Sequence, residues 1–129
     1  MPKIRIDFCF QSDKLNFDFI THQLGINPTR TRRREECPIP EFGATYWRLS
    51  TEKEETLVLD NQFKKILQLL IGKEHIINEI AQKYDAQTAF NVVIEAPSMG
   101  GPEVVLYPDV VSFASSINAE IGFDLYIGE

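Results

Sequence analysis

The residues with the clearest capacity for chemistry are four arginines within five consecutive positions, in the segment 29–34. Each guanidinium group is a planar fork of donors that matches a phosphate or a carboxylate. Two aromatic residues and a fifth arginine follow at positions 46–48, and aromatic rings can stack on a base or on an arginine. The candidate residues for binding a ligand or a partner are therefore Arg30, Arg32, Arg33, Arg34, Tyr46, Trp47 and Arg48.

A second interpretation of the arginine run is a solvated loop that pairs with its own acidic neighbours. Glu35 and Glu36 follow the run directly, and short charge runs of this kind commonly lie in solvent. If all four arginines contacted phosphates, counterion release would give a salt slope of only about −3.6. We therefore expect no dedicated nucleic-acid partner.

The titratable residues that could catalyse a reaction lie outside any recognisable motif. His22 and His75 fall on predicted helices, and histidine is the usual acid or base near neutral pH. The sequence contains no GxSxG, P-loop, GxGxxG or HExxH pattern. The pair Glu54 and Glu55 lies in a charged stretch where solvation explains it. No catalytic residue is predicted; the sequence leaves catalysis undecided and favours a non-enzymatic role.

Metal and cofactor sites are not predicted either. Cys9 and Cys37 lack CxxC spacing, and together with two scattered histidines they do not form a zinc-binding pattern. The segment 98–101 could present backbone N–H groups to an anion, but its turn-forming composition is explained by a plain connection between strands. We expect reduced thiols, no metal and no cofactor.

Length and composition constrain the number of domains and the class of protein. A chain of 129 residues predicts a single domain over residues 1–129. Its content of 43% hydrophobic and 25% charged residues excludes an intrinsically disordered protein. No apolar run reaches the roughly 18–20 residues that span a bilayer, and residues 1–10 alternate polar with apolar, unlike a secretory signal. We expect a cytoplasmic protein without a membrane partner.

The formal net charge of −6 is unevenly distributed along the chain. Residues 1–84 carry 13 basic and 12 acidic side chains, whereas residues 85–129 carry seven acidic side chains and no basic one. An acidic surface repels phosphate backbones and suits a basic partner, although it can also serve solubility alone.

Hydrophobic periodicity predicts the elements that position these residues. Alternation predicts strands over residues 3–10, 46–50 and 87–96, with a return strand over 103–107. It also predicts a final strand over 123–127, with residue 121 as an alternative start. Helical spacing predicts a helix from Asn16, as N-cap, to Gly25. It also predicts a helical pair that begins near residue 59 and breaks at Gly72, or one kinked helix, and a helix that starts at Pro108.

The predicted fold class is α+β. Without the helical block at about 57–85 and the short return strand, the order of elements consists of two β-α-β halves. We therefore expect a ferredoxin-like split β-α-β sandwich, an antiparallel sheet with helices on one face, with an inserted helical hairpin. Its two chain ends should contribute strands to one sheet.

Several short segments, taken in order, resemble a known family. They are Leu24-Gly25-Ile26-Asn27-Pro28-Thr29, Tyr46-Trp47-Arg48-Leu49-Ser50, the helical block 67–84, and Ile117-Asn118-Ala119-Glu120-Ile121-Gly122-Phe123-Asp124-Leu125-Tyr126. In this order they resemble the bacterial domain-of-unknown-function family 4279 over nearly the whole chain. Asn118 stands where the family's closing turn would have glycine. The resemblance implies a small bacterial domain and no catalytic residue.

Three hypotheses for function remain open. The first is a non-enzymatic protein-binding module, immunity-like or regulatory, that uses the acidic C-terminal portion or the arginine loop. The alternative is a small-molecule or nucleotide-phosphate binding domain, which requires the candidate residues to converge on one concave pocket. A homodimer that forms through sheet edges is the third, since an open sheet leaves edges that need covering.

Overall fold

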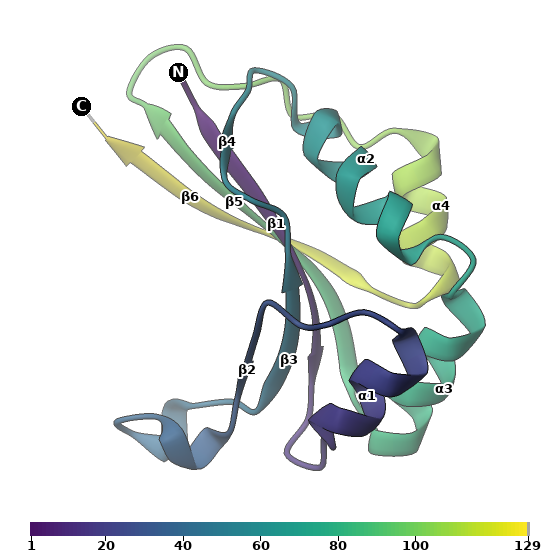
Figure 1. Ribbon diagram of the computed structural model, residues 1–129. Helices are drawn as coiled ribbons and strands as arrows, with labels where there is room; N and C mark the ends of the chain where they lie inside the picture. The colour runs from purple at the N-terminus through teal and green to yellow at the C-terminus, as the bar shows by residue number, and fades with distance from the viewer. Residues whose placement is uncertain (129) are drawn as a thin grey trace.

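The computed structural model describes residues 1–128 and contains one sheet and four helices (Figure 1). The strands are β1 (Lys3–Gln11), β2 (Arg30–Arg32), β3 (Tyr46–Ser50), β4 (Glu54–Glu55), β5 (Gln87–Pro97) and β6 (Glu120–Gly128). The helices are α1 (Phe17–Leu24), α2 (Leu59–Leu70), α3 (Glu74–Tyr84) and α4 (Pro108–Ser116), and two short 3₁₀ turns, η1 (Arg34–Glu36) and η2 (Pro40–Phe42), lie between β2 and β3.

The sheet has the strand order β2-β3-β1-β5-β6, with β4 paired to the start of β1. Strand β1 is antiparallel to both β3 and β5, and β5 is parallel to β6. The two ends of the chain therefore belong to one sheet, as expected. The ferredoxin-like split β-α-β arrangement is not confirmed, because β5 and β6 of the last β-α-β unit are direct neighbours and no other strand lies between them.

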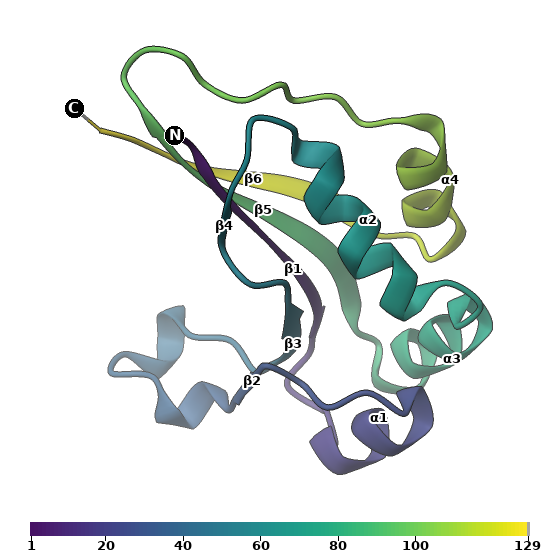
Figure 2. The ribbon, with the colours of Figure 1, turned by 45° about the horizontal axis from the view of Figure 1, so that its top comes forward.

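All four helices lie on one face of the sheet, and the other face is open (Figures 1 and 2). The predicted pair of helices is present and is separated at Gly72, where the backbone has a positive φ of 85°. An inserted hairpin is not confirmed, because α3 packs against α1 while α2 packs against β1. These two helices are part of the layer that covers the sheet.

The predicted caps of α1 are confirmed. The Asn16 side chain accepts a hydrogen bond of 3.0 Å from the backbone N–H of Phe19 at the start of α1. Gly25 ends the helix with a φ of 69°, a left-handed conformation that costs glycine little. Asn118 takes the same conformation after α4, with a φ of 52°, and asparagine tolerates it better than most residues.

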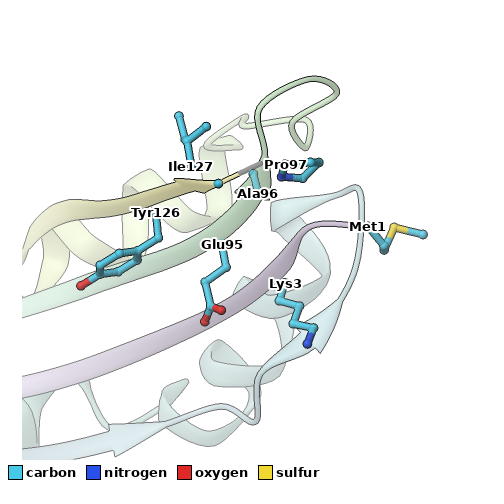
Figure 3. A pocket seen from close by; sticks show the side chains of 8 residues that line it. Met1, Lys3, Glu95, Ala96, Pro97, Tyr126 and Ile127 are labelled. Carbon is cyan, nitrogen blue, oxygen red and sulfur yellow. The ribbon is translucent and has the colours of Figure 1, made fainter.

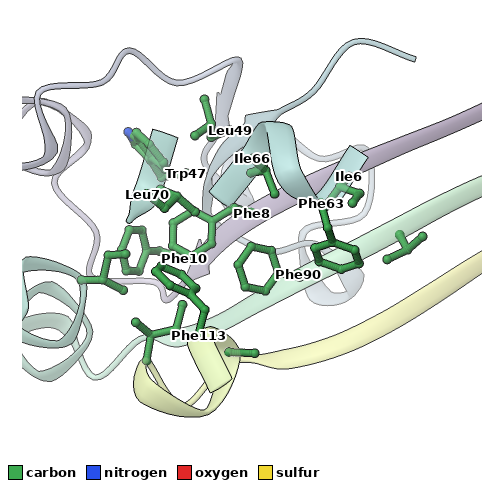
Figure 4. Packing of buried hydrophobic residues seen from close by; sticks show 14 of the residues in the cluster. Ile6, Phe8, Phe10, Trp47, Leu49, Phe63, Ile66, Leu70, Phe90 and Phe113 are labelled. Atoms are coloured by element: carbon green, nitrogen blue, oxygen red, sulfur yellow. The ribbon is translucent and has the colours of Figure 1, made fainter. Parts of the chain in front are cut away.

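The core lies between the sheet and the helices (Figure 4). The alternating side chains of β1 and β5 supply the sheet side of the core, and the apolar stripes of the helices cover it. Aromatic rings dominate its centre, where Phe90 contacts Phe8, Phe63 and Phe113 with ring centroids 5.4 to 6.3 Å apart. Rings at these distances stabilise a core beyond the burial of their area.

The return strand expected at residues 103–107 is wrong. Only Glu103 forms a bridge, and it does so in parallel with Val58 before α2. The reason is topological, since β1 and β6 already occupy both sides of β5 and leave no edge for a hairpin partner. The segment instead runs past the start of α2 to Pro108, which begins α4 as predicted (Figure 1).

Candidate binding surface

Strand β3 separates the candidate residues between the two faces of the sheet. Trp47 faces the helices and is fully buried, and its indole N–H donates a hydrogen bond of 3.1 Å to the Thr21 hydroxyl on α1. Tyr46 and Arg48 lie on either side of it in the strand and so point to the open face. The structure therefore places Trp47 in the core and away from the other two.

Strand register brings two more of the candidate arginines to the open face. Arg30 pairs with Arg48 and Arg32 pairs with Tyr46 across the β2–β3 ladder. The guanidinium carbons of Arg32 and Arg48 lie 5.3 and 4.3 Å from the centroid of the Tyr46 ring. Such stacking holds an arginine in place while its outer nitrogens stay free to donate.

A buried carboxylate from β1 completes this cluster. Asp7 is 1% exposed and accepts hydrogen bonds of 3.0 and 3.4 Å from Arg5 and one of 2.6 Å from the Ser50 hydroxyl. The Nε atom of Arg48 lies 3.9 Å from the same carboxylate. Sequence reasoning did not select Arg5, Asp7 or Ser50; alternation placed Arg5 and Asp7 on one face, but it could not show that β1 lies beside β3.

We call this cluster the arginine patch and define it as Arg5, Arg30, Arg32, Tyr46 and Arg48 around Asp7. Its positive charge is only partly neutralised. Arg30 and Arg32 form no ion pair with any residue in the range 1–128, and Asp7 is already bonded to Arg5. The Nε atoms of Arg32 and Arg48 are buried and make no hydrogen bond within that range. The patch therefore has an excess of donors and of positive charge.

The remaining two arginines of the run have structural contacts instead. Arg33 donates from Nη1 to the Leu15 carbonyl at 2.9 Å and lies over the Phe17 ring at 4.3 Å. Arg34 donates to the Pro40 carbonyl at 2.6 Å and pairs with Asp13 at 3.3 Å. These bonds fasten the loop between β2 and β3 to the start of α1 and to the β1–α1 connection. The run does not converge on one pocket.

The other titratable residues that the sequence drew attention to do not form a site together. His22 and His75 are exposed on α1 and α3, and His75 contacts Glu79 one turn later at 2.8 Å. Glu54 pairs with Lys65 of α2. On the open face, burial raises the pKa of the Cys9 thiol, an effect that the neighbouring Arg48 guanidinium partly opposes.

Two cavities lie on the open face. The smaller one, of about 360 Å³, is lined by Arg5 of the arginine patch together with Lys53, Val93, Glu95 and Tyr126. The larger one, of about 500 Å³, lies over the ends of β1, β5 and β6 (Figure 3). Lys3, Glu95 and Tyr126 are among the residues that line it. A hydrogen bond from Lys53 lowers the pKa of Glu95, so this carboxylate is already engaged. Of the patch residues, only Arg5 lines either of these cavities, and Arg30, Arg32, Tyr46 and Arg48 lie outside both.

The comparison with family models identifies the same family that the short segments of the sequence, taken in order, resemble. The family described as "Domain of unknown function (DUF4279)" matches residues 2–128. The chain belongs to this family. No curated protein and no solved structure matches the chain. Membership in DUF4279 thus accounts for the whole domain and assigns no role to the arginine patch.

Within residues 1–128 of this DUF4279 domain, each helix is too short or too polar to cross a membrane.

Proposed function

We propose that this chain is a non-enzymatic protein-binding module whose arginine patch binds an acidic segment of a protein partner. The observation that carries the proposal is the position of Arg32 and Arg48, both stacked on Tyr46 and both with a buried Nε atom that makes no hydrogen bond. An immunity-like or regulatory role in a bacterial cytoplasm is part of the same proposal.

The charge of the patch favours an anionic ligand. The patch contains four guanidinium groups and one carboxylate, and that carboxylate already accepts hydrogen bonds from Arg5 and Ser50. A buried donor without an acceptor costs roughly 1–3 kcal/mol. An incoming carboxylate that draws Arg48 or Arg32 into a bidentate pair would recover part of this free energy.

The shape of the patch favours an extended segment of protein over a small molecule. Small-molecule sites are concave and enclose most of the ligand, whereas the patch is spread over the adjacent strands β2, β3 and β1. An acidic segment that crosses these strands can reach several guanidinium groups at once. A nucleotide or phosphate ligand remains the alternative, with the same arginines as donors.

Fluorescence anisotropy with a labelled glutamate-rich peptide tests the proposal. The double variant Arg32→Gln/Arg48→Gln removes both stacked guanidinium groups, and we expect the affinity to fall at least tenfold. Lys64→Gln/Lys73→Gln is the matched control, because it changes the net charge equally on the helix side of the molecule. We expect this control to bind nearly as the wild type does.

Two results would overturn the proposal. Equal losses in both double variants would show that only net charge matters, and no binding of the acidic peptide at low salt would remove its basis. A third arm uses inorganic phosphate and ATP in a thermal-shift assay, where a ligand at 100 times its Kd stabilises by about 2.7 kcal/mol. Stabilisation by ATP without binding of the peptide would replace the protein partner with a nucleotide.

A further inference from the structure

Strand β6 forms a long, unpaired edge of the sheet. It pairs with β5 along nine residues, and no strand within residues 1–128 lies on its other side. The opposite edge is formed by β2, which has only three residues. An unpaired edge presents a row of free backbone donors and acceptors and so acts as a template for another strand.

Several of the usual protections of an edge strand are absent from β6, whose charged residues are Glu120 and Asp124. It contains no lysine, arginine or proline, and it makes all nine of its pairs with β5 in unbroken register. Its side chains on the helix face are apolar and exposed, with Phe123 40%, Leu125 59% and Ile127 67% accessible. Figure 1 shows the reason, since the C-terminal half of β6 runs past α4 and no helix covers it.

We propose that β6 pairs with β6 of a second copy of this chain, antiparallel, to form a symmetric dimer with a continuous sheet. A two-fold axis perpendicular to the sheet keeps both helix layers on the same side. Residues of the helix face must then oppose residues of the helix face, which allows only registers centred on a single residue.

Charge and coverage favour one of these registers. A centre at Asp124 would set two carboxylates directly opposite each other, which is destabilising. A centre at Phe123 would set Ile127, the most exposed apolar residue of the strand, before the first residue of the partner's strand, and a centre at Tyr126 would set Phe123 beyond its last residue. A centre at Leu125 pairs Leu125 with its own copy and Phe123 with Ile127, and places Asp124 opposite Tyr126.

This register turns two small apolar strips into one continuous surface. Six side chains, three from each copy, come together on the helix face where each copy alone leaves them in water. Burial of such area is the main favourable term in association. Each chain carries a net charge of −6, so the two copies repel each other and salt should strengthen the dimer.

A second copy and a basic partner strand respond to salt in opposite directions. A basic segment would also fit an acidic edge, but its affinity would fall with salt and the chain alone would stay monomeric. Sedimentation equilibrium of the purified chain, from micromolar to millimolar concentration at low and high salt, distinguishes these cases. We expect a dimer fraction that rises with concentration and with salt; a monomer throughout overturns the proposal.

Two variants test the surface. Leu125→Lys places two ammonium groups face to face at the two-fold axis, and we expect it to abolish the dimer. Leu69→Lys changes a comparably exposed leucine on α2, 46% accessible, and should leave the dimer intact. Emission from buried Trp47 confirms that both variants are folded. A dimer that survives Leu125→Lys would overturn the assignment to β6.

Disulfide trapping tests the register. Directly opposed residues have Cα atoms about 4.5–5.5 Å apart, within reach of a disulfide, whereas two residues offset along the strands exceed about 7 Å. Under mild oxidation we therefore expect Leu125→Cys to form a covalent dimer. Asp124→Cys should form little, and the wild type, with Cys9 half-buried in β1 away from β6 and Cys37 buried, should form none. More cross-linking by Asp124→Cys than by Leu125→Cys would overturn this register.

Discussion

The indole N–H of Trp47 donates its hydrogen bond to the hydroxyl of Thr21 across 3.1 Å and joins β3 to α1 inside the core. The tryptophan is fully buried, so its donor has no access to water. The same bond fixes which way β3 faces, and with it the outward direction of Tyr46 and Arg48.

Removal of this acceptor should destabilise the fold. We expect Thr21→Val to lower the free energy of unfolding by about 1–3 kcal/mol, because a buried N–H is left without a partner. Thr21→Ser keeps the hydroxyl and should cost less. Urea unfolding followed by the emission of Trp47, the single tryptophan, measures both. Equal losses for valine and serine would mean that packing, not the hydrogen bond, stabilises this contact.

Asp7 should be the most sensitive polar position in the sheet. Asp7→Ala removes the acceptor of Arg5 and Ser50 together, and we expect a loss of about 2–3 kcal/mol, since hydrogen bonds to charged groups are the stronger ones. Ser50→Ala removes a single bond to the same carboxylate and should cost about 1 kcal/mol. Chemical denaturation compares the two. The assignment fails if Ser50→Ala is the more damaging variant.

The left-handed end of α1 predicts an effect of backbone conformation alone. Gly25 has a φ of 69°, and a Cβ atom there would meet nothing within 4 Å. Gly25→Ala should therefore cost about 1–2 kcal/mol from strain without a clash. Gly25→Asn should cost less. Gly101→Ala also meets open space and has no positive φ, so its thermal unfolding should match that of the wild type.

The thiol of Cys9 should react slowly at neutral pH. Burial raises its pKa, so the thiolate fraction at pH 7 is smaller than for a free cysteine, and the thiolate is the reactive form. In a Cys37→Ala background, we expect the rate of reaction with a disulfide reagent to keep rising above the usual thiol pKa. The unfolded chain in urea should level off at lower pH. A folded-state plateau near neutral pH would contradict this.

The sign of the same shift gives a stability effect. The folded state binds the proton of the Cys9 thiol more tightly than the unfolded state does. Its contribution to the free energy of unfolding is therefore fully present at a pH below the pKa of Cys9 in the unfolded chain. This contribution is lost as the pH rises through the pKa of Cys9 in the folded state.

Local patterns in the sequence predicted most helices and strands. The features that were predicted wrongly depend on pairing between strands that are distant in the chain. Alternation in β1 and the caps at Asn16 and Gly25 are local signals, and the structure confirms them. The return strand failed because its place depended on β6 already lying beside β5, a pairing that no local signal records. The ferredoxin-like split β-α-β arrangement was predicted because the sequence likewise does not record that β5 and β6 are direct neighbours.

The candidate site was partly predictable for a related reason. Residue type pointed to Arg32, Tyr46 and Arg48, and alternation within β3 separated Trp47 from its neighbours. Asp7 was missed because it meets Ser50 only through the β1–β3 register, 43 residues apart in the chain. In the sequence, Arg33 and Arg34 cannot be told apart from the other arginines of the run. In the structure, the path of the loop brings Arg33 to the Leu15 carbonyl and Arg34 to Asp13.

The central position of β1 has a consequence for biosynthesis. Its neighbour β5 begins at Gln87 and ends at Pro97, so the ribosome makes the second strand of this ladder long after the first. Until β5 is made, the edge of β1 that pairs with it is unpaired, and the isoleucine and phenylalanine side chains of β1 are incompletely covered. Exposed apolar surface and unpaired strand edges of this kind are prone to aggregation, which is the condition that chaperones counter.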